Sequence, residues 1–372
     1  VFAIGLMGSV SVTWWVGSMY FLPTVIITGL LVIYKLKRHT LFFSYLWASL
    51  ATVAALSLFR GDNLVESLLQ QTLSWPLIFL GVFMLTEPLT TPPTKKLQAI
   101  YGAIVGVLSS FPYAFPPLYS TPELALLIGN IFTFAVSTKS RVFLSLIEKK
   151  EIAKDTFELT FKPSEKVSYQ PGQYMEWTLP GKEVDIRGIR RYFTIASSPL
   201  EDVIRLGVKR AEKGSSFKNS LFSLEEGKGL LATSVMGDFL LPEDKDRTLV
   251  FIAGGIGITP FISMLRTLLI KKEKRDIVLI YANKQESEIA YKYVLEEAVR
   301  ELGVRVVYVL SDLATLPKDW GGEKGFITEQ ILETHVTAVV SSFYYISGPP
   351  SMVSSYSALL QSMHVCKADI TT

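Results

Sequence analysis

One stretch of the sequence combines a cation, aromatic rings and hydroxyl groups in a pattern typical of a β-strand. It reads Arg191-Tyr192-Phe193-Thr194-Ile195-Ala196-Ser197-Ser198. In a strand, alternate residues share a face, so that Arg191, Phe193 and Ile195 lie opposite Thr194. A guanidinium can bind a pyrophosphate through two charge-assisted hydrogen bonds, an aromatic face can stack on a flat ring, and a hydroxyl can bond a ring nitrogen. An ordinary strand could carry the same residues, so this pattern alone is a weak signal.

A short glycine-serine segment could bind phosphate through its backbone amides. Gly214, Ser215 and Ser216 precede apolar residues at helical spacing, which makes Ser215 or Ser216 the expected N-cap of a helix. The first turn of a helix presents amides that bind anions. A capped surface helix that binds nothing is the common alternative.

A glycine loop follows the apolar run at residues 248–253. It reads Gly254-Gly255-Ile256-Gly257-Ile258-Thr259-Pro260. Thr259 is expected to cap a helix with Pro260 at its first position, where a missing N–H costs nothing. Glycines let backbone amides approach a nucleotide pyrophosphate closely. A second strand, turn and helix are predicted around Ser347-Gly348-Pro349.

The elements that must position these segments change in character along the chain. Short alternating runs, separated by Pro-Gly turns, predict an antiparallel β-barrel over residues 141–245. Residues 246–372 predict a doubly wound α/β domain, because apolar strands alternate with amphipathic helices. The expected strands are Thr248–Ala253 and Ile277–Tyr281, and the expected helices are Phe261–Ile270 and Ile289–Leu302.

Residues 1–140 form a separate, apolar part with seven Lys/Arg and four Asp/Glu. A membrane span needs roughly 20 apolar residues. Stretches that approach this length lie at about residues 14–34, 41–59, 73–89, 97–115 and 121–138. Counting Arg141, just beyond this part, the loops after the first, third and fifth stretches hold seven Lys/Arg, whereas the alternate loops hold only Arg60. This asymmetry predicts a multi-pass integral membrane domain with about five helices, followed by cytoplasmic domains.

Composition excludes several kinds of function. The soluble part holds 30 basic and 30 acidic residues, which excludes a basic nucleic-acid-binding face. Cys366 is the sole cysteine, so disulfide scaffolds and Cys-ligated iron–sulfur clusters are excluded. None of the three histidines lies inside an expected span, which excludes intramembrane haem. Since the sequence does not begin with Met, we expect the natural chain to be longer at its N-terminus, and at its C-terminus too.

The segment from Arg191 to Ser198 resembles the flavin signature of the ferredoxin–NADP reductase superfamily. The resemblance implies that Arg191 binds the pyrophosphate of FAD, that Phe193 stacks on the flavin and that Thr194 reaches its N5 atom. It places Ile195, Ser197 and the Gly214–Ser216 turn at the same cofactor. Phe193 takes a position where the family also uses Tyr.

The same resemblance implies that the glycine loop, through Gly254, Gly255, Gly257, Thr259 and Pro260, binds NAD(P)H as substrate. The Ser347-Gly348-Pro349 turn resembles the family's Cys-Gly-Pro-Pro, whose Cys lies by the nicotinamide. Because Ser347 replaces that Cys, we expect an altered rate or fit rather than an inactive enzyme. Lys284 could meet the 2′-phosphate of NADPH, but an isolated surface lysine is more often only solvated.

The N-terminal part resembles the homologous membrane subunits of Rnf electron-transport complexes and of the sodium-pumping NADH:quinone reductase. The similarity covers about residues 14–138 and includes the segments FMLTEPLTTPPTKK, IYGAIVGVL and TPELALLIGNIF. Relatives carry a covalent FMN, although its attachment motif is absent from this chain. The resemblances together predict a membrane-bound flavoprotein that passes electrons from NAD(P)H through FAD to a membrane flavin, a quinone or a redox protein. The alternative is a non-catalytic nucleotide-sensing or structural component of an Rnf-like complex.

Overall fold

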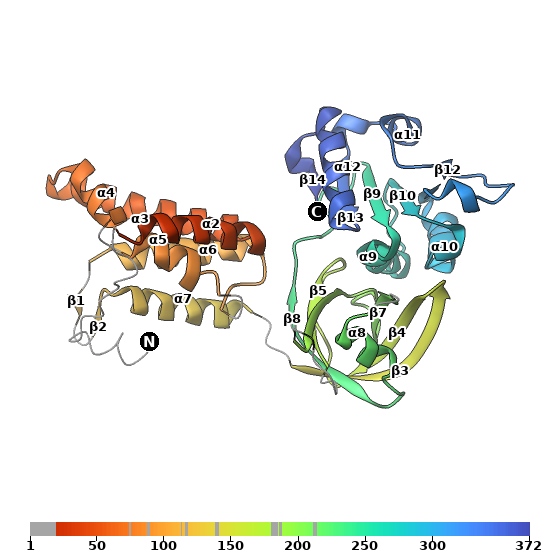
Figure 1. Cartoon of the computed structure of the whole chain (residues 1–372), viewed down its shortest axis with the longest axis horizontal. Coiled ribbons are helices and arrows are strands. Elements are labelled where there is room, and N and C mark those ends of the chain that lie inside the picture. Colours follow the sequence, from red (N-terminus) through yellow and green to blue (C-terminus); the bar gives the residue numbers. More distant parts are fainter. Residues whose placement is uncertain are drawn as a thin grey trace. The chain divides into compact units, whose positions relative to one another are not determined.

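The computed structural model describes residues 20–73, 76–87, 90–112, 114–115, 118–137, 141–179, 185, 188–210 and 214–372. The chain divides into two compact units, Val1–Lys139 and Ser140–Thr372 (Figure 1). Both predicted nucleotide domains fall within the second unit.

The first unit is helical. Its helices are α2 (Leu22–Leu36), α3 (His39–Arg60), α4 (Leu64–Leu73), α5 (Leu77–Phe79), the π-helix η2 (Leu80–Met84), α6 (Lys95–Ser110) and α7 (Pro122–Val136), with a short hairpin of β1 (Ala114–Phe115) and β2 (Leu118–Tyr119). Helix α7 begins where the Thr121 hydroxyl accepts a hydrogen bond from the Leu124 amide, at 3.1 Å. Gly102 and Gly106, one turn apart, let α6 pack closely on α3. A Cβ on Gly102 would lie 2.6 Å from the Leu41 carbonyl oxygen.

The helix lengths do not confirm five membrane spans. Among the described residues, only His39–Arg60 is long and apolar enough to cross a membrane. A second span exists only if Leu64–Leu73 and Leu77–Met84, bent by 57°, are counted as one. Helices α2 and α7 are apolar but have 15 residues each, about 22 Å, against a hydrocarbon core of about 30 Å. Residues 14–19 of the first predicted span and residue 138 at the end of the last one lie outside the described residues.

The second unit begins with a curved antiparallel sheet. Its strands are β3 (Val142–Ala153), β4 (Thr156–Pro163), β5 (Tyr174–Thr178), β6 (Arg190–Thr194), β7 (Ile204–Lys209) and β8 (Gly229–Met236). They pair in the order β6-β5-β8-β3-β4-β7, and the amide of Ala196 beyond β6 donates to the Arg205 carbonyl on β7. Trp177 and Phe161 lie in the fully buried core, as alternation predicts. Helix α8 (Ser216–Phe222) covers one end. We call this half the barrel.

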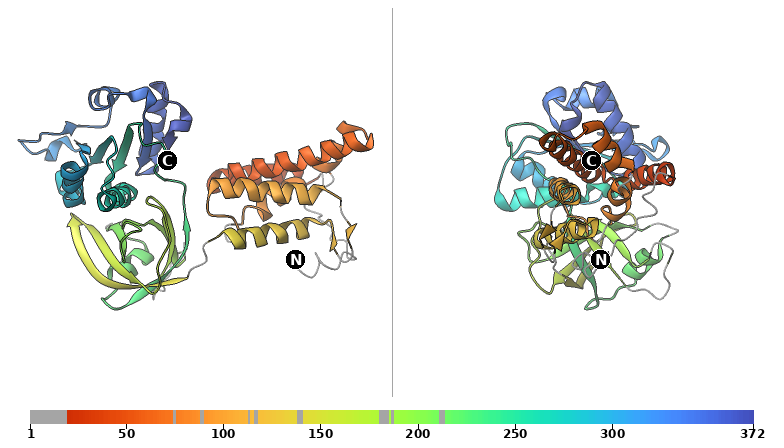
Figure 2. Two further views of the ribbon diagram at one scale, coloured as in Figure 1. Left: turned by 180° about the vertical axis from the view of Figure 1, so that it is seen from behind. Right: turned by 90° about the vertical axis from the view of Figure 1, so that its left-hand side faces the viewer.

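The rest of the unit is a parallel six-stranded sheet with helices on both faces (Figure 2). Its strands are β9 (Leu249–Gly254), β10 (Ile277–Asn283), β11 (Arg305–Leu310), β12 (Glu323–Lys324), β13 (Phe343–Ser347) and β14 (Ile370–Thr371), in the order β12-β11-β10-β9-β13-β14. Its helices are α9 (Thr259–Lys271), α10 (Lys292–Leu302), α11 (Glu329–His335) and α12 (Pro350–Ser362). Short 3-10 turns include η3 (Gly255–Ile258) and η4 (Glu286–Glu288). Strand β9 is buried along its whole length, as a sheet covered on both faces requires.

Two predicted helix starts are wrong. The helix expected from Ile289 begins at Lys292, because Tyr291 adopts a left-handed conformation, with φ of 60°, and turns its ring into the core. Thr259 does not cap α9; the cap position is Ile258, and Pro260 is the second helical residue. The preceding 3-10 turn already gives the Thr259 amide an acceptor, the Ile256 carbonyl, and the Thr259 hydroxyl donates to the same carbonyl at 3.2 Å instead of accepting from the helix.

Candidate functional site

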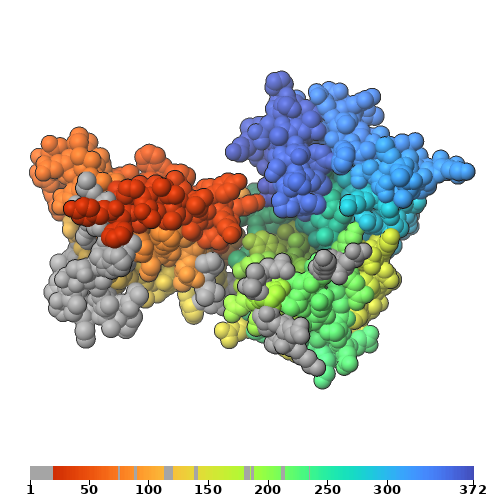
Figure 3. Space-filling view, in the orientation of Figure 1, coloured from red at the N-terminus to blue at the C-terminus, as the bar shows by residue number. Residues whose placement is uncertain are grey.

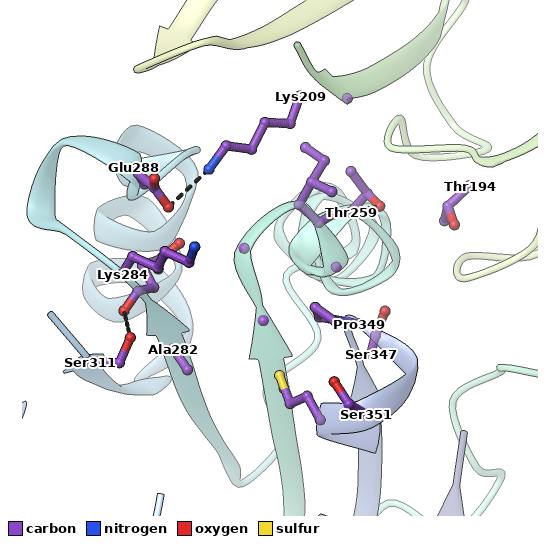
Figure 4. A pocket seen from close by; sticks show the side chains of 18 of the residues that line it. Thr194, Lys209, Thr259, Ala282, Lys284, Glu288, Ser311, Ser347, Pro349 and Ser351 are labelled. Atoms are coloured by element: carbon purple, nitrogen blue, oxygen red, sulfur yellow. Dashed lines mark hydrogen bonds and ion pairs between the residues drawn. The ribbon is translucent and has the colours of Figure 1, made fainter. Parts of the chain in front are cut away.

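A cavity of about 880 Å³ lies between the barrel and the parallel sheet of the second unit. Thr194 and Phe193 line it from the end of β6, and the glycine loop and Ser347 line it from the ends of β9 and β13. Figure 4 shows Thr194 on the barrel side and Thr259 with Ser347 on the α/β side. The volume is within the range of small-molecule sites. The structure thus brings together the two segments that the sequence singled out for different nucleotides.

The ring of Phe193 is held by other aromatic rings. Its centroid lies 5.7 Å from that of Phe217 on α8 and 6.5 Å from that of Trp177 on β5. Thr194 pairs with Tyr174 across the β5–β6 ladder. Ring packing therefore fixes the Phe193 side chain, and strand pairing fixes the backbone at Thr194, where β6 reaches the cavity.

Arg191 and the start of α8 meet at an aspartate that the sequence analysis missed. The Arg191 guanidinium binds both carboxylate oxygens of Asp185, at 2.9 and 3.1 Å. The amide of Asp185 donates to the Ser216 hydroxyl at 3.1 Å. The guanidinium carbon also lies 5.6 Å from the Phe217 ring centre. Arg191 and the Gly214–Ser216 turn are therefore neighbours, although they do not line the described part of the cavity.

The predicted cap of α8 is confirmed. Ser215 is the N-cap residue, and its hydroxyl accepts a hydrogen bond from the Lys218 amide at 3.3 Å. The Lys218 ammonium group lines the cavity and donates to the Lys209 carbonyl at 2.8 Å. Neither lysine was found from the sequence, because no local motif marks a lysine that reaches across a fold.

Ile195 and Ser197 lie inside the barrel rather than at the cavity. Both side chains are fully buried. The Ser197 hydroxyl shares a hydrogen bond of 2.9 Å with the Tyr169 hydroxyl and accepts one from the Arg205 amide. Burial raises the pKa of Tyr169, so that this hydroxyl stays protonated. These two side chains stabilise the strand that carries Thr194, and only their backbone could face a ligand.

The glycines of the loop have different reasons to be glycine. Gly255 has a φ of 53°, and a Cβ there would meet no described atom within 4 Å. A Cβ on Gly257 would lie 2.6 Å from the Ser347 carbonyl carbon and 2.7 Å from the Gly348 Cα. Gly257 also lines the cavity, so the close approach of a nucleotide to its backbone stays a prediction. Its missing side chain lets the loop pack against the Ser347–Pro349 turn.

Ser347 ends β13, beside the glycine loop. It pairs with Ala253 on β9, and Gly348 and Pro349 line the cavity after it. Pro349 is the N-cap residue of α12. Strand pairing thus places Ser347 beside the strand that feeds the glycine loop. Pro260 lies away from the cavity, within the buried start of α9.

The far end of the cavity is polar. Asn283, at the end of β10, is 6% exposed, and neither polar atom of its amide makes a hydrogen bond to the described residues. Lys284 and Ser311 also line this end. The Lys209 ammonium pairs with the Glu288 carboxylate at 2.9 Å, an ion pair that joins β7 to η4 (Figure 4). Of these residues, the sequence analysis named only Lys284.

Comparison with known proteins supports the predicted nucleotide-binding character of the second unit. Residues 251–358 match the model of the oxidoreductase NAD-binding domain. A flavohemoprotein of Bacillus subtilis is 30% identical over 235 residues, which cover 62% of this chain and 55% of the relative. The reductase subunit of an aromatic O-demethylase from Amycolatopsis is 31% identical over 217 residues, 57% of this chain and 62% of the relative. The chain thus spans roughly half to three fifths of these relatives.

A solved structure carries the same fold. The crystal structure of a cytochrome P450 reductase from Amycolatopsis aligns with a TM-score of 0.56 and 28% identity, over 63% of this chain and 69% of that one. An antiparallel sheet followed by a parallel α/β sheet is the ferredoxin–NADP reductase-like arrangement that the sequence predicted. These similarities show that the second unit has the fold of the FAD- and NAD-binding oxidoreductases of that superfamily, and they support the predicted resemblance.

Proposed function

We propose that the whole chain takes a hydride from NAD(P)H onto an FAD bound by the barrel, and delivers the electrons to an acceptor at a membrane. One observation carries the first half of this proposal. Thr194 of the flavin-like signature, the glycine loop and Ser347 line one cavity of about 880 Å³. A hydride donor and an acceptor must meet in such a space.

The barrel residues fit a flavin dinucleotide. When bound, FAD accepts a hydride from reduced nicotinamide and can release its electrons singly. Arg191 and Ser216, which meet at Asp185, would hold the pyrophosphate by charge-assisted hydrogen bonds. Phe193 would support the flat ring, and the hydroxyl of Thr194 would hydrogen-bond its edge. Asp185 and the phosphates would then both bind the Arg191 guanidinium, and Asp185 would keep that planar group in place.

The α/β residues fit a nicotinamide dinucleotide. Gly255 offers bare backbone at the cavity wall, and no described atom occupies the space where its side chain would lie. Among the described residues, three lysines line the cavity against one carboxylate, that of Glu288, which suits a polyanionic ligand. Ser347 would lie beside the nicotinamide ring, where it orients the ring without reacting.

Anaerobic stopped-flow mixing of the FAD-loaded full chain with NADH or NADPH tests this function. We expect bleaching of flavin absorbance near 450 nm, with one dinucleotide oxidised per FAD. FAD that is bound but that neither dinucleotide reduces would contradict the proposal and favour the nucleotide-sensing alternative.

We propose further that the helical unit attaches the enzyme to a membrane. Helix α3 has the length of a span, and large apolar side chains face outward on several helices, among them Leu31, Trp47, Phe59 and Phe134, each more than 60% exposed. Figure 3 shows α2 at the surface of this unit. Soluble units rarely expose so much apolar surface. A cysteine introduced at Ser120 should be labelled by a thiol reagent added outside intact cells. Release of the full chain from membranes by alkaline carbonate would contradict the attachment.

The acceptor follows from the same proposal. Electrons would pass to a quinone, to a redox protein or to a flavin such as FMN in the helical unit. The resemblance to the membrane subunits of the Rnf complex and the sodium pump remains a prediction. Measuring flavin stoichiometry in the membrane-extracted full chain distinguishes one flavin per chain from two.

A further inference from the structure

Helix α9 is held against the flavin-signature segment by three polar side chains. The Ser263 hydroxyl donates to the Ser197 carbonyl at 2.6 Å, and the Arg266 guanidinium donates to the Ala196 carbonyl at 3.0 Å. The Thr267 hydroxyl bonds the Ser198 hydroxyl at 2.9 Å. Positions 263, 266 and 267 share one face of a helix. Figures 1 and 2 show α9 between the parallel sheet and the barrel.

These three contacts lie directly behind the cavity. Thr259, which lines the cavity at the start of α9, precedes Ser263 by one helical turn. Thr194, which lines it from the barrel, precedes Ala196 by two residues. The contacts therefore join the two walls that would carry the hydride donor and acceptor.

The surroundings leave the contact between α9 and residues 196–198 little freedom to move. Arg266 also binds the Glu158 carboxylate at 2.9 Å, and that side chain is 4% exposed. Burial lowers the pKa of Arg266, but the interactions with Glu158, Tyr293, Tyr291 and Glu201 together more than offset it, so that the pKa is raised and the guanidinium stays charged. Close by, a Cβ on Gly207 of β7 would lie 2.6 Å from the Thr259 Cγ2. Close packing and a buried ion pair hold the two halves at one separation.

We infer that Ser263, Arg266 and Thr267 are positioning residues, which set the distance between the dinucleotide on the glycine loop and the flavin beside Thr194. The inference rests on the proposed function. In that reaction NAD(P)H gives up one hydride, which carries two electrons, and so becomes NAD(P)+. The hydride reduces the flavin. A misplacement of about 1 Å can slow such a transfer by about 100-fold. None of the three side chains lines the cavity, so ligand binding should not depend on them.

The double variant Ser263→Ala/Thr267→Val tests the inference in the FAD-loaded full chain. Both substitutions delete a hydroxyl and keep the packing, and Arg266 stays in place so that Glu158 keeps its partner. We expect hydride transfer at saturating dinucleotide to slow about tenfold, while the Kd values for FAD and dinucleotide change less than twofold. Amide hydrogen exchange in peptides covering Ala196–Ser198 and Gly255–Ser263 should speed up.

Ser342→Ala is the matched control. Ser342 is equally buried, and its hydroxyl donates to the Ala338 carbonyl, away from α9. The control should lose similar thermal stability and keep both the transfer rate and the exchange pattern. Equal slowing in the control, or unchanged transfer in the double variant, overturns the inference. If wild-type FAD is not reduced by either dinucleotide, it is the proposed function that fails.

Discussion

The two halves of the reductase unit approach the cavity with different parts of the chain. The barrel presents the side chains of Phe193 and Thr194 at the cavity and that of Arg191 beside α8. The α/β half presents backbone at Gly254, Gly255 and Gly348 where the glycine loop and the turn after β13 meet, and larger side chains such as Lys284 and Met352 elsewhere on its wall. Under the proposed function, the barrel would recognise its ligand through side chains, whereas the glycine loop would do so through bare backbone. Deleting atoms should therefore damage the barrel, and adding atoms should damage the α/β half.

The largest effect is expected from Gly257→Ala. The new methyl group would overlap the Ser347–Gly348 backbone, and relieving it must move the wall of the cavity. Overpacking of this kind costs about 1–3 kcal/mol, and displacement of the wall should slow flavin reduction by NAD(P)H about 100-fold. Stopped-flow reduction and thermal melting measure both effects.

Gly255→Ala is the control within the same loop. Its Cβ meets no described atom, so only the left-handed backbone is strained, by about 1–2 kcal/mol. FAD should stay bound in both variants. Loss of FAD with retained dinucleotide binding would reverse the assignment of the two halves.

The next largest effect is expected from Arg191→Ala, a deletion in the barrel. A charge-assisted contact with a pyrophosphate contributes about 1.5–3 kcal/mol, which corresponds to an FAD Kd raised about 10- to 150-fold. Fluorescence titration of the FAD-free protein measures it. Arg190→Ala removes the same charge from a side chain that is 58% exposed and paired with Glu176, and should change the Kd about twofold at most. Equal Kd values for the two variants would remove Arg191 from the site.

A smaller effect is expected from Thr194→Val, which removes one hydroxyl from the cavity wall. Loss of a hydrogen bond to the flavin edge should slow hydride transfer up to about tenfold at unchanged FAD content. Thr156→Val, a buried hydroxyl deletion elsewhere in the barrel, should leave the rate unchanged. A normal rate in Thr194→Val would mean that the hydroxyl does not reach the flavin.

The smallest effect is expected from Ser347→Ala, a deletion in the half that works by backbone. The rate of flavin reduction should change by about twofold, because the adjoining Gly348 backbone is untouched. Ser347→Cys should behave similarly. If Ser347→Ala slowed flavin reduction by as large a factor as Arg191→Ala raises the FAD Kd, side chains would matter equally in both halves.

Local physics made much of the second unit predictable. Short alternating runs gave antiparallel strands, and the apolar run before Gly254 gave a strand buried on both faces. The glycine loop and the Ser215 cap depend on residues next to one another, so their signals survive in sequence. The helical unit was less predictable, because hydropathy reports that a stretch is apolar but not where its helix ends. Helix α6 ends at Ser110, five residues before the predicted span does.

The sequence by itself determined which segments could hold nucleotides and in what order they occur. Only the tertiary structure decided that Gly257 packs against Ser347 and that Asp185 joins Arg191 to Ser216. It also decided that α9 is bonded to the flavin-signature segment. The physical reason is range: capping, turns and alternation act over a few residues, whereas these contacts join segments brought together by sheet topology. Which atoms meet across that topology depends on packing that no local pattern encodes.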